Sequence, residues 1–318
     1  MLTKIRNILR MNRRQARAPR ESGLPKLSGA ELARSSWAKP VESYADVPDA
    51  FRAFFEPLLV SGRAFPYTIL TPSHERFIHK TSEKLICAFD HEIDVLERSG
   101  NAFEAHCFPL EGISFVEFRT ALLASRFQIC GEINHAVHTS PTLTFNSVTD
   151  YLFKPILKRI RLASVASSNV AQGSELENFD DLVRVNYKFM NFAKHSLLEG
   201  ERVICFILQP EIRESMLTVL GKTYFRTISP THMSILTDRE LILIREEAAR
   251  RKEDRYGGIW AYIPLRKIAS LSLSEKDGNL LTLTVKLFEN ISFEFLFEVS
   301  AKEEIDRLLH RFKGLTAG

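Results

Sequence analysis

Apolar and polar residues alternate along two segments near the C-terminus, residues 282–287 and 292–297. Successive side chains of a β-strand point to opposite faces, so a period of two predicts half-buried antiparallel strands. Turn-forming residues stand beside both segments, with Asp277-Gly278-Asn279 before the first and Glu289-Asn290 between the two. The pattern therefore predicts a β-hairpin in this part of the chain.

The period changes to that of a helix after residue 300. Four apolar residues of this segment share one face at 100° per residue. They are Ile305, Leu308, Leu309 and Phe312. Ser300 and Glu303 have the spacing of a capping box, which predicts Ser300 as the N-cap. We therefore predict a helix over 301–312 whose apolar face lies in the core.

Three more amphipathic segments predict helices, near residues 47–61, 148–160 and 181–198. Gly62 and Gly200 follow the first and the last of them. Glycine often stands just past the end of a helix, because it adopts the left-handed backbone that this position needs. Both glycines are therefore predicted to end their helices.

Two stretches of the chain contain residues in the same order. Segments 51–62 and 189–200 both run from phenylalanine to glycine over eleven positions, and a proline follows ten positions later in each. Four further matches continue the series. They pair 81–87 with 237–243, 108–113 with 263–268, 122–123 with 280–281, and 156–161 with 308–313. Matches in a single order are hard to obtain by chance, so the sequence predicts an internal duplication.

The stretch between the repeats, residues 163–174, is small and polar, which is typical of a linker. Residues 21–46 are similarly weak in pattern. We therefore expect four regions. They are a basic arm with a flexible linker at 1–46, a first domain at 47–162, a linker at 163–180 and a second domain at 181–318.

The second repeat resembles the pleckstrin-homology-like (PH-like) and GRAM-like domains of bacteria. Segment 234–244 is similar to the second hairpin of that family, and segment 262–271 to the Ile-Pro-Leu segment that follows it. The resemblance covers about 220–315 directly and 65–161 through the repeat. It implies a mainly β fold with capping helices (α+β): two PH-like partial barrels or β-sandwiches, each closed by a C-terminal helix. It also implies binding of a protein or a lipid, although a fold does not by itself fix the ligand.

Composition is that of a globular protein, with 45% hydrophobic and 26% charged residues. The longest apolar runs have the length of a strand, and the basic N-terminus lacks the apolar region of a secretory signal. The four cysteines show no Cys-x-x-Cys spacing, which fits a reducing compartment. We therefore expect a cytoplasmic protein.

The basic residues are concentrated in the first twenty positions. The net charge is +4, and residues 1–20 contain seven cations and no acid, so the rest of the chain carries −3. The residues expected to contact an anionic partner are Lys4, Arg6, Arg10, Arg13 and Arg14. Leu2, Ile5, Ile8 and Leu9 lie on one face of the same segment, which favours peripheral contact with the inner face of the membrane. The alternative is a nucleic-acid-associated protein whose arm contacts phosphates, which the acidic body disfavours.

A second basic cluster lies between two predicted strands. It consists of Arg250, Arg251, Lys252 and Arg255. A charged insertion of this kind is usually a solvated hairpin tip. The alternative is a binding loop, because loops on rigid β-scaffolds often carry function.

Catalytic motifs are missing from the sequence, which contains neither a phosphate-binding glycine loop nor a Gly-x-Ser-x-Gly element. His91 stands between Asp90 and Glu92, but adjacent strand residues point to opposite faces, so a hairpin turn explains it better. We therefore expect a binding protein rather than an enzyme, with no small-molecule substrate. A protein or an anionic lipid is the expected partner.

Two sets of residues are candidate metal ligands. His74 and His79 are five positions apart, whereas the helical zinc motif needs four. Cys130, His135 and His138 are close in sequence but have no fourth ligand nearby. We therefore expect neither a metal nor another cofactor.

Overall fold

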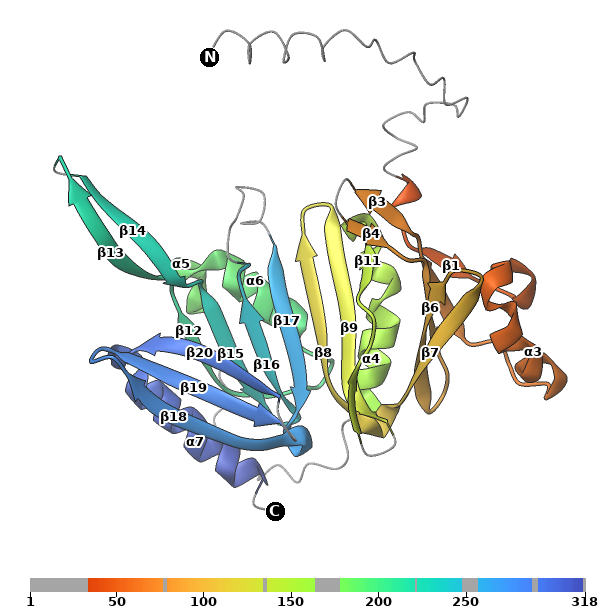
Figure 1. Ribbon diagram of the computed structural model, residues 1–318. Helices are drawn as coiled ribbons and strands as arrows, with labels where there is room; N and C mark the ends of the chain where they lie inside the picture. The colour runs from red at the N-terminus through yellow and green to blue at the C-terminus, as the bar shows by residue number, and fades with distance from the viewer. Residues whose placement is uncertain are drawn as a thin grey trace, which may run out of the picture. The chain divides into compact units, whose positions relative to one another are not determined.

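The computed structural model describes residues 34–76, 79–133, 136–163, 178–220, 222–247, 257–287 and 291–316. At 74–76, 79–80 and 219 it describes the backbone alone. By its contacts the chain divides into two units, Met1–Ser35 and Ser36–Gly318. The elements that follow all belong to the second unit, which is mainly β (Figure 1).

The first half of this unit begins with β1 (Lys39–Val41), two 3-10 turns, η1 (Tyr44–Asp46) and η2 (Asp49–Phe51), and α3 (Arg52–Val60). Its remaining strands are β2 (Tyr67–Thr71), β3 (His74–Arg76), β4 (His79–Thr81), β5 (Lys84–Ala88), β6 (Glu92–Ser99), β7 (Ala102–Pro109), β8 (Ile113–Ala121), β9 (Ala124–Ile133), β10 (Ala136–Thr139) and β11 (Leu143–Phe145). Three helical segments complete it: η3 (Leu110–Gly112), η4 (Ser147–Leu152) and α4 (Lys154–Ala163). One antiparallel sheet has the order β1-β2-β5-β6-β7, and β3 and β4 form a separate hairpin. Residues 39–41, which the sequence placed in a flexible linker, thus form the edge strand of this sheet.

The second half begins with α5 (Leu182–Val185) and α6 (Tyr187–Ser196). Its strands are β12 (Val203–Gln209), β13 (Ile212–Val219), β14 (Lys222–Ser229), β15 (His232–Thr237), β16 (Glu240–Arg245), β17 (Gly258–Pro264), β18 (Ile268–Lys276), β19 (Leu280–Leu287) and β20 (Ser292–Glu298). Its other helical segments are η6 (Leu265–Lys267), η7 (Val299–Ala301) and α7 (Lys302–Thr316). Strands β18, β19 and β20 form a three-stranded antiparallel sheet, which confirms the predicted strands at 282–287 and 292–297. The backbone of Asp277 and Gly278 is left-handed at the turn between β18 and β19, as those residues predicted.

A single sheet joins the two halves. Its strand order is β10-β9-β8-β17-β16-β15-β12, and β11 pairs with β9 beside this path. Strand β8 of the first half pairs antiparallel with β17 of the second, with Trp260 opposite Phe118. No sheet in the described part of the chain closes into a barrel.

The closing helix α7 packs as its apolar stripe predicted. Ile305, Leu308 and Phe312 are buried against strands of the second half, and Leu309 is half-buried beside them. The predicted capping box is wrong. Ser300 lies inside the 3-10 turn η7 that leads into α7, and Glu298 stands at the N-cap of that turn without a side-chain hydrogen bond. The tighter turn satisfies the first backbone groups, so the box is not formed.

The other predicted helices differ from the structure at their ends. The segment predicted as a helix at 148–160 is broken into η4 and α4, because the backbone of Thr149 is not helical. Gly62 follows α3 with a φ of 67° and donates to the carbonyl of Leu59, which confirms it as a helix end. Gly200 also has a positive φ, but α6 ends at Ser196, so this glycine serves a separate turn.

The joined sheet is covered on both faces in its second half. Helix α7 and strands β18–β20 bury one face, and α5 and α6 bury the other. This double cover explains why β16 is a continuous apolar run at residues 241–244 rather than an alternating one. Helix α4 belongs to the core of the first half, where Ile156 and Ile160 are buried.

Candidate functional site

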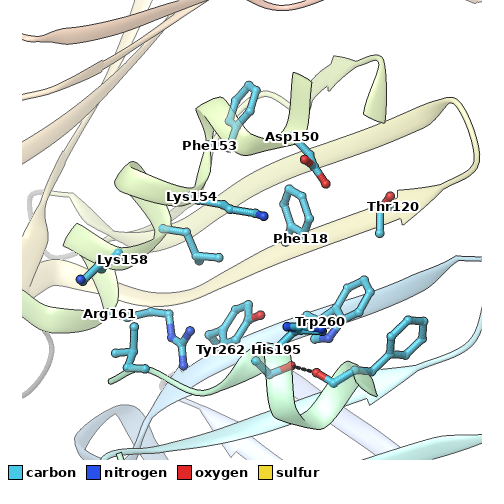
Figure 2. A pocket seen from close by; sticks show the side chains of 14 residues that line it. Phe118, Thr120, Asp150, Phe153, Lys154, Lys158, Arg161, His195, Trp260 and Tyr262 are labelled. Carbon is cyan, nitrogen blue, oxygen red and sulfur yellow. Dashed lines mark hydrogen bonds between the residues drawn. The ribbon is translucent and has the colours of Figure 1, made fainter. Parts of the chain in front are cut away.

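A pocket with a cavity volume of about 400 Å3 lies where α4 and α6 face the β8–β17 strand pair (Figure 2). Its residues come from segments that are far apart in the sequence. They are brought together because β8 and β17 are neighbours in the joined sheet. Pockets of this size in proteins commonly hold small molecules, which occupy roughly 300–1,000 Å3.

The floor of the pocket is aromatic. Phe118 and Thr120 project from β8, and Trp260 and Tyr262 from β17. Residues two apart on a strand share a face, and the register places Phe118 opposite Trp260, so these side chains point into the same space. The ring centres of Phe118 and Trp260 are 6.4 Å apart.

The two helices supply the walls at helical spacing. Lys154, Leu157, Lys158 and Arg161 of α4 line the pocket, and their separations of three and four residues put them on one face. Helix α6 contributes Phe192, His195 and Ser196 in the same way. The ring of Phe192 meets that of Trp260 edge-on at 4.8 Å, which joins this wall to the floor.

Glycines at the start of β17 permit the close approach of floor and walls. A Cβ atom on Gly257 would lie 2.0 Å from the carbonyl oxygen of Thr120 in β8. A Cβ on Gly258 would lie 2.9 Å from the rings of both Phe192 and Trp260. Larger residues at these positions would separate β17 from β8 or displace the aromatic rings.

The charge at the mouth of the pocket is mainly positive. Lys154 and Lys158 are exposed, and within the described residues neither has an ion pair. Lys154 extends from α4 toward Phe118, as Figure 2 shows. Asp150 provides the one carboxylate among the lining residues, and His195 adds an exposed imidazole. The arrangement therefore offers an apolar floor and exposed cations above it.

Arg161 closes the inner end of the pocket and is already paired. Its Nε donates to Oε1 of Glu240 at 2.8 Å, and its Nη2 donates to Oε2 of Glu201 at 3.2 Å. Its guanidinium carbon also lies 4.1 Å from the ring centre of Tyr262. Arg161 belongs to the first half of the unit and its three partners to the second, so this cluster ties the halves together.

The carboxylates of this cluster are held by further hydrogen bonds. Glu201 accepts from the backbone N–H of Leu198 and from the hydroxyl of Thr237, both at 2.7 Å. Thr237 in turn accepts from the N–H of Glu240 at 3.0 Å in the β15–β16 turn. The side chains of Arg161, Glu201 and Glu240 are all nearly inaccessible to solvent. Two buried carboxylates thus share one guanidinium.

Glu240 should make the stability of the protein depend on pH. Burial, opposed by Arg161 and reinforced by Glu201, raises the pKa of Glu240 from 4.5 to about 8. The folded state therefore holds this proton more tightly than the unfolded chain does. The stabilising contribution is complete below the unfolded value of 4.5 and is lost as the pH rises through about 8.

In Glu240→Gln the side chain is neutral at every pH, so this loss of stability at high pH should not occur. The free energy of unfolding of the variant should rise relative to the parent between about pH 5 and about pH 9. Urea melts over this range measure the difference, and taking the difference cancels the contributions of other titrating groups. An exposed carboxylate on α7, Glu303, provides the control as Glu303→Gln. A constant difference across the range would contradict the prediction.

The basic residues singled out in the sequence lie outside the described part of the chain. This applies to Lys4, Arg6, Arg10, Arg13 and Arg14 of the arm. It applies equally to Arg250, Arg251, Lys252 and Arg255 of the loop before β17. Both sets remain predictions.

The histidines and cysteines weighed as ligands fall in different places. His91 lies in the turn between β5 and β6, as predicted. Cys130 is buried in β9 and His138 is exposed on β10, whereas His135 and the side chains of His74 and His79 are outside the described residues. Within the described residues no group of His, Cys, Asp and Glu side chains could hold a metal ion.

Two titratable groups away from the pocket, the buried His232 and the surface residue Cys107, also have shifted pKa values. His232 is packed against the rings of Phe295 and Phe297, and burial lowers its pKa to about 4, so it is neutral. Partial burial raises the pKa of the Cys107 thiol to about 12, with Asp94 as a further cause, which disfavours the thiolate.

The pocket was not foreseen from the sequence, which indicated no small-molecule ligand. One signal was present: Lys154, Lys158 and Arg161 are spaced along one helix face that also carries Leu157. Within the described residues no helix has the length and apolar character needed to cross a membrane. The sequence matches no protein-family model, and comparison with the curated proteins gives no significant match.

Proposed function

We propose that this chain is a non-enzymatic binding protein of two PH-like modules, and that its pocket binds an amphipathic anion such as a lipid with an acidic head group. The observation that carries the proposal is the combination of an aromatic floor with two lysines, Lys154 and Lys158, that have no ion pair within the described residues.

The order of elements supports the duplication. In each half a helix precedes a strand, a hairpin then leaves the sheet, and three more sheet strands follow. Each half then continues with further antiparallel strands and ends in a helix, α4 or α7. This is the order that the internal repeat and the PH-like resemblance imply. The lining of the pocket by both copies would explain why both are in one chain.

The chemistry of the lining favours a lipid over a peptide or a sugar. Trp260, Phe118, Phe192 and Leu157 offer apolar side chains, and the exposed surface of the pocket is mainly apolar. A peptide or sugar leaves its polar groups unsatisfied on such a floor, at a cost for each. An alkyl chain does not, and its anionic end would reach Lys154 or Lys158 at the mouth. Such a ligand also fits peripheral contact with the inner face of the membrane by a cytoplasmic protein.

Binding can be measured through the fluorescence of Trp260. The chain has two tryptophans, so a Trp37→Phe background leaves Trp260, in the pocket floor, as the reporter. The probes are a twelve-carbon fatty acid and a lysophosphatidic acid, which separate carboxylate from phosphate as the head group. Dodecanol and lysophosphatidylcholine, which carry no net charge, are the neutral counterparts.

We expect at least one anionic probe to change the fluorescence and to bind about tenfold more tightly than its neutral counterpart. Lys154→Gln combined with Lys158→Gln should remove this preference, and added salt should weaken it. Lys194→Gln is the matched control, because Lys194 is exposed on α6 and paired with Asp180 but does not line the pocket. Equal binding of charged and neutral probes, or no binding of either, would contradict the proposal.

A further inference from the structure

The hairpin formed by β13 and β14 stands away from the rest of the fold (Figure 1). It leaves the joined sheet between β12 and β15, and within the described chain its two strands pair only with each other. Its length of eight residues per strand carries the tip well beyond the sheet from which it arises.

Large apolar side chains cover this hairpin and are exposed. They are Met216, Leu217, Leu220, Tyr224 and Phe225. Leu217 is opposite Tyr224, whereas Phe225 is opposite Ser215 on the neighbouring register position. Because adjacent positions of a strand point to opposite faces, Tyr224 and Phe225 project from the two faces of the hairpin. Both faces of the hairpin are therefore exposed, and neither packs against the rest of the described protein.

The turn at the tip of the hairpin does not explain why a leucine stands at position 220. Leu220 is 98% exposed and has a φ of 51°, in the left-handed region that glycine and asparagine favour. A leucine here contributes no core contact and strains its own backbone. Asparagine followed by Gly221 is the pair that such a turn usually contains. The leucine is thus better accounted for by what it contacts outside this chain.

The charges of the hairpin have mainly one sign. Segment 212–229 contains Arg213, Lys222 and Arg226 but one acid, Glu214, for a net charge of +2. Arg213 is paired with Glu211 at the base. Lys222 and Arg226 are exposed and without an ion pair within the described residues.

We propose that the tip of the β13–β14 hairpin inserts into the interfacial layer of an anionic membrane. A groove on a protein covers one face of an inserted hairpin, whereas lipid surrounds it on all sides, which matches apolar side chains on both faces. Tyrosine is typical of the membrane interface, and phenylalanine and leucine together with cations are typical of segments that lie in it. Lys222 and Arg226 would meet the acidic head groups.

The depth of insertion is limited by the backbone. Within the described residues, both edges of the two-stranded sheet carry N–H and C=O groups without partners in a sheet. These groups cannot enter hydrocarbon without a large cost. The tip therefore reaches the head-group layer, where water remains available, and the base of the hairpin stays outside. This inference does not depend on the ligand of the pocket, whose lining residues lie on other elements.

The test is sedimentation of the full-length protein with vesicles, comparing phosphatidylglycerol–phosphatidylcholine mixtures with phosphatidylcholine alone. The parent should bind the anionic vesicles more tightly, and salt should weaken binding. Leu220→Asn should bind them about tenfold more weakly. Its melting temperature should be unchanged or higher, because asparagine suits the turn, so lost binding cannot be attributed to misfolding.

Val60→Asn is the matched control, since Val60 is 90% exposed at the end of α3, at the far end of the unit from the hairpin (Figure 1). It should bind vesicles like the parent. Absence of vesicle binding by the parent, or equal binding by Leu220→Asn, overturns the proposal. So does a parent dimer that Leu220→Asn converts to monomers without a change in vesicle binding, because the hairpin would then join two copies of the chain.

Discussion

Arg161→Met should lower the free energy of unfolding by about 3–5 kcal/mol at and above pH 8. Methionine fills much of the space of the arginine side chain but leaves Glu201 and Glu240 without a cation. Both carboxylates are buried, with side chains at most 5% exposed. An uncompensated buried charge is far more costly than a lost surface ion pair.

The loss should become smaller as the pH falls. Burial and Glu201 already favour the protonated form of Glu240, and removal of Arg161 favours its protonation further. Urea melts at about pH 5 and about pH 9 should therefore show a smaller difference from the parent at the lower pH. Combining Arg161→Met with Glu240→Gln should recover part of the loss at high pH, since one of the two carboxylates is then gone.

Lys158→Met is the matched control for charge removal on the same helix. Lys158 is exposed, and within the described residues it has no ion pair. The expected change is within about 0.5 kcal/mol. If Arg161→Met melts like Lys158→Met, the buried cluster does not hold the two halves together.

Leu308→Ala should cost about 2–5 kcal/mol, which is a large part of the stability of a typical domain. Leu308 is fully buried in α7 among the strands of the second half, so shortening it leaves a cavity. Ile156→Ala in α4 should behave alike, because Ile156 is 1% exposed in the core of the first half. The two positions correspond in the internal repeat that the sequence predicts.

His310→Ala is the control for the effect of an alanine on the helix itself. His310 lies close to Leu308 on α7 but is exposed, so its replacement leaves no cavity. It should change the free energy of unfolding by less than about 0.5 kcal/mol in the same urea melts. If Leu308→Ala matches His310→Ala, α7 is a detachable appendage and the view of both closing helices as core elements is wrong.

Local periodicity was sufficient to predict the elements whose buried positions follow from their own residue order. The alternation in 282–287 and 292–297 fixed β19 and β20, and the stripe ending at Phe312 fixed α7. In a strand with one buried face, or a helix with one buried stripe, the spacing of the apolar residues shows which side is buried. The left-handed turn at Asp277-Gly278 is local in the same sense.

Helix ends were predicted less well. The sequence placed a capping box at Ser300 and a helix end at Gly200, but the chain uses a 3-10 turn at the first and a separate turn at the second. Several local arrangements can satisfy the same few backbone groups at similar cost. Packing of the following element decides among them.

The pocket and the buried ion cluster depend on the tertiary structure alone. Their residues lie near 118, 154–161, 192–201, 240 and 260, and the pairing of β8 with β17 brings them together. Edge strands carry the same backbone donors and acceptors whatever their side chains, so the sequence of β8 does not specify β17 as its neighbour. The sequence by itself determined strands β19 and β20 and the closing helix α7, because those follow from short-range periodicity. Which strands from the two halves meet, and what site they enclose, was decided by long-range pairing that no local pattern records.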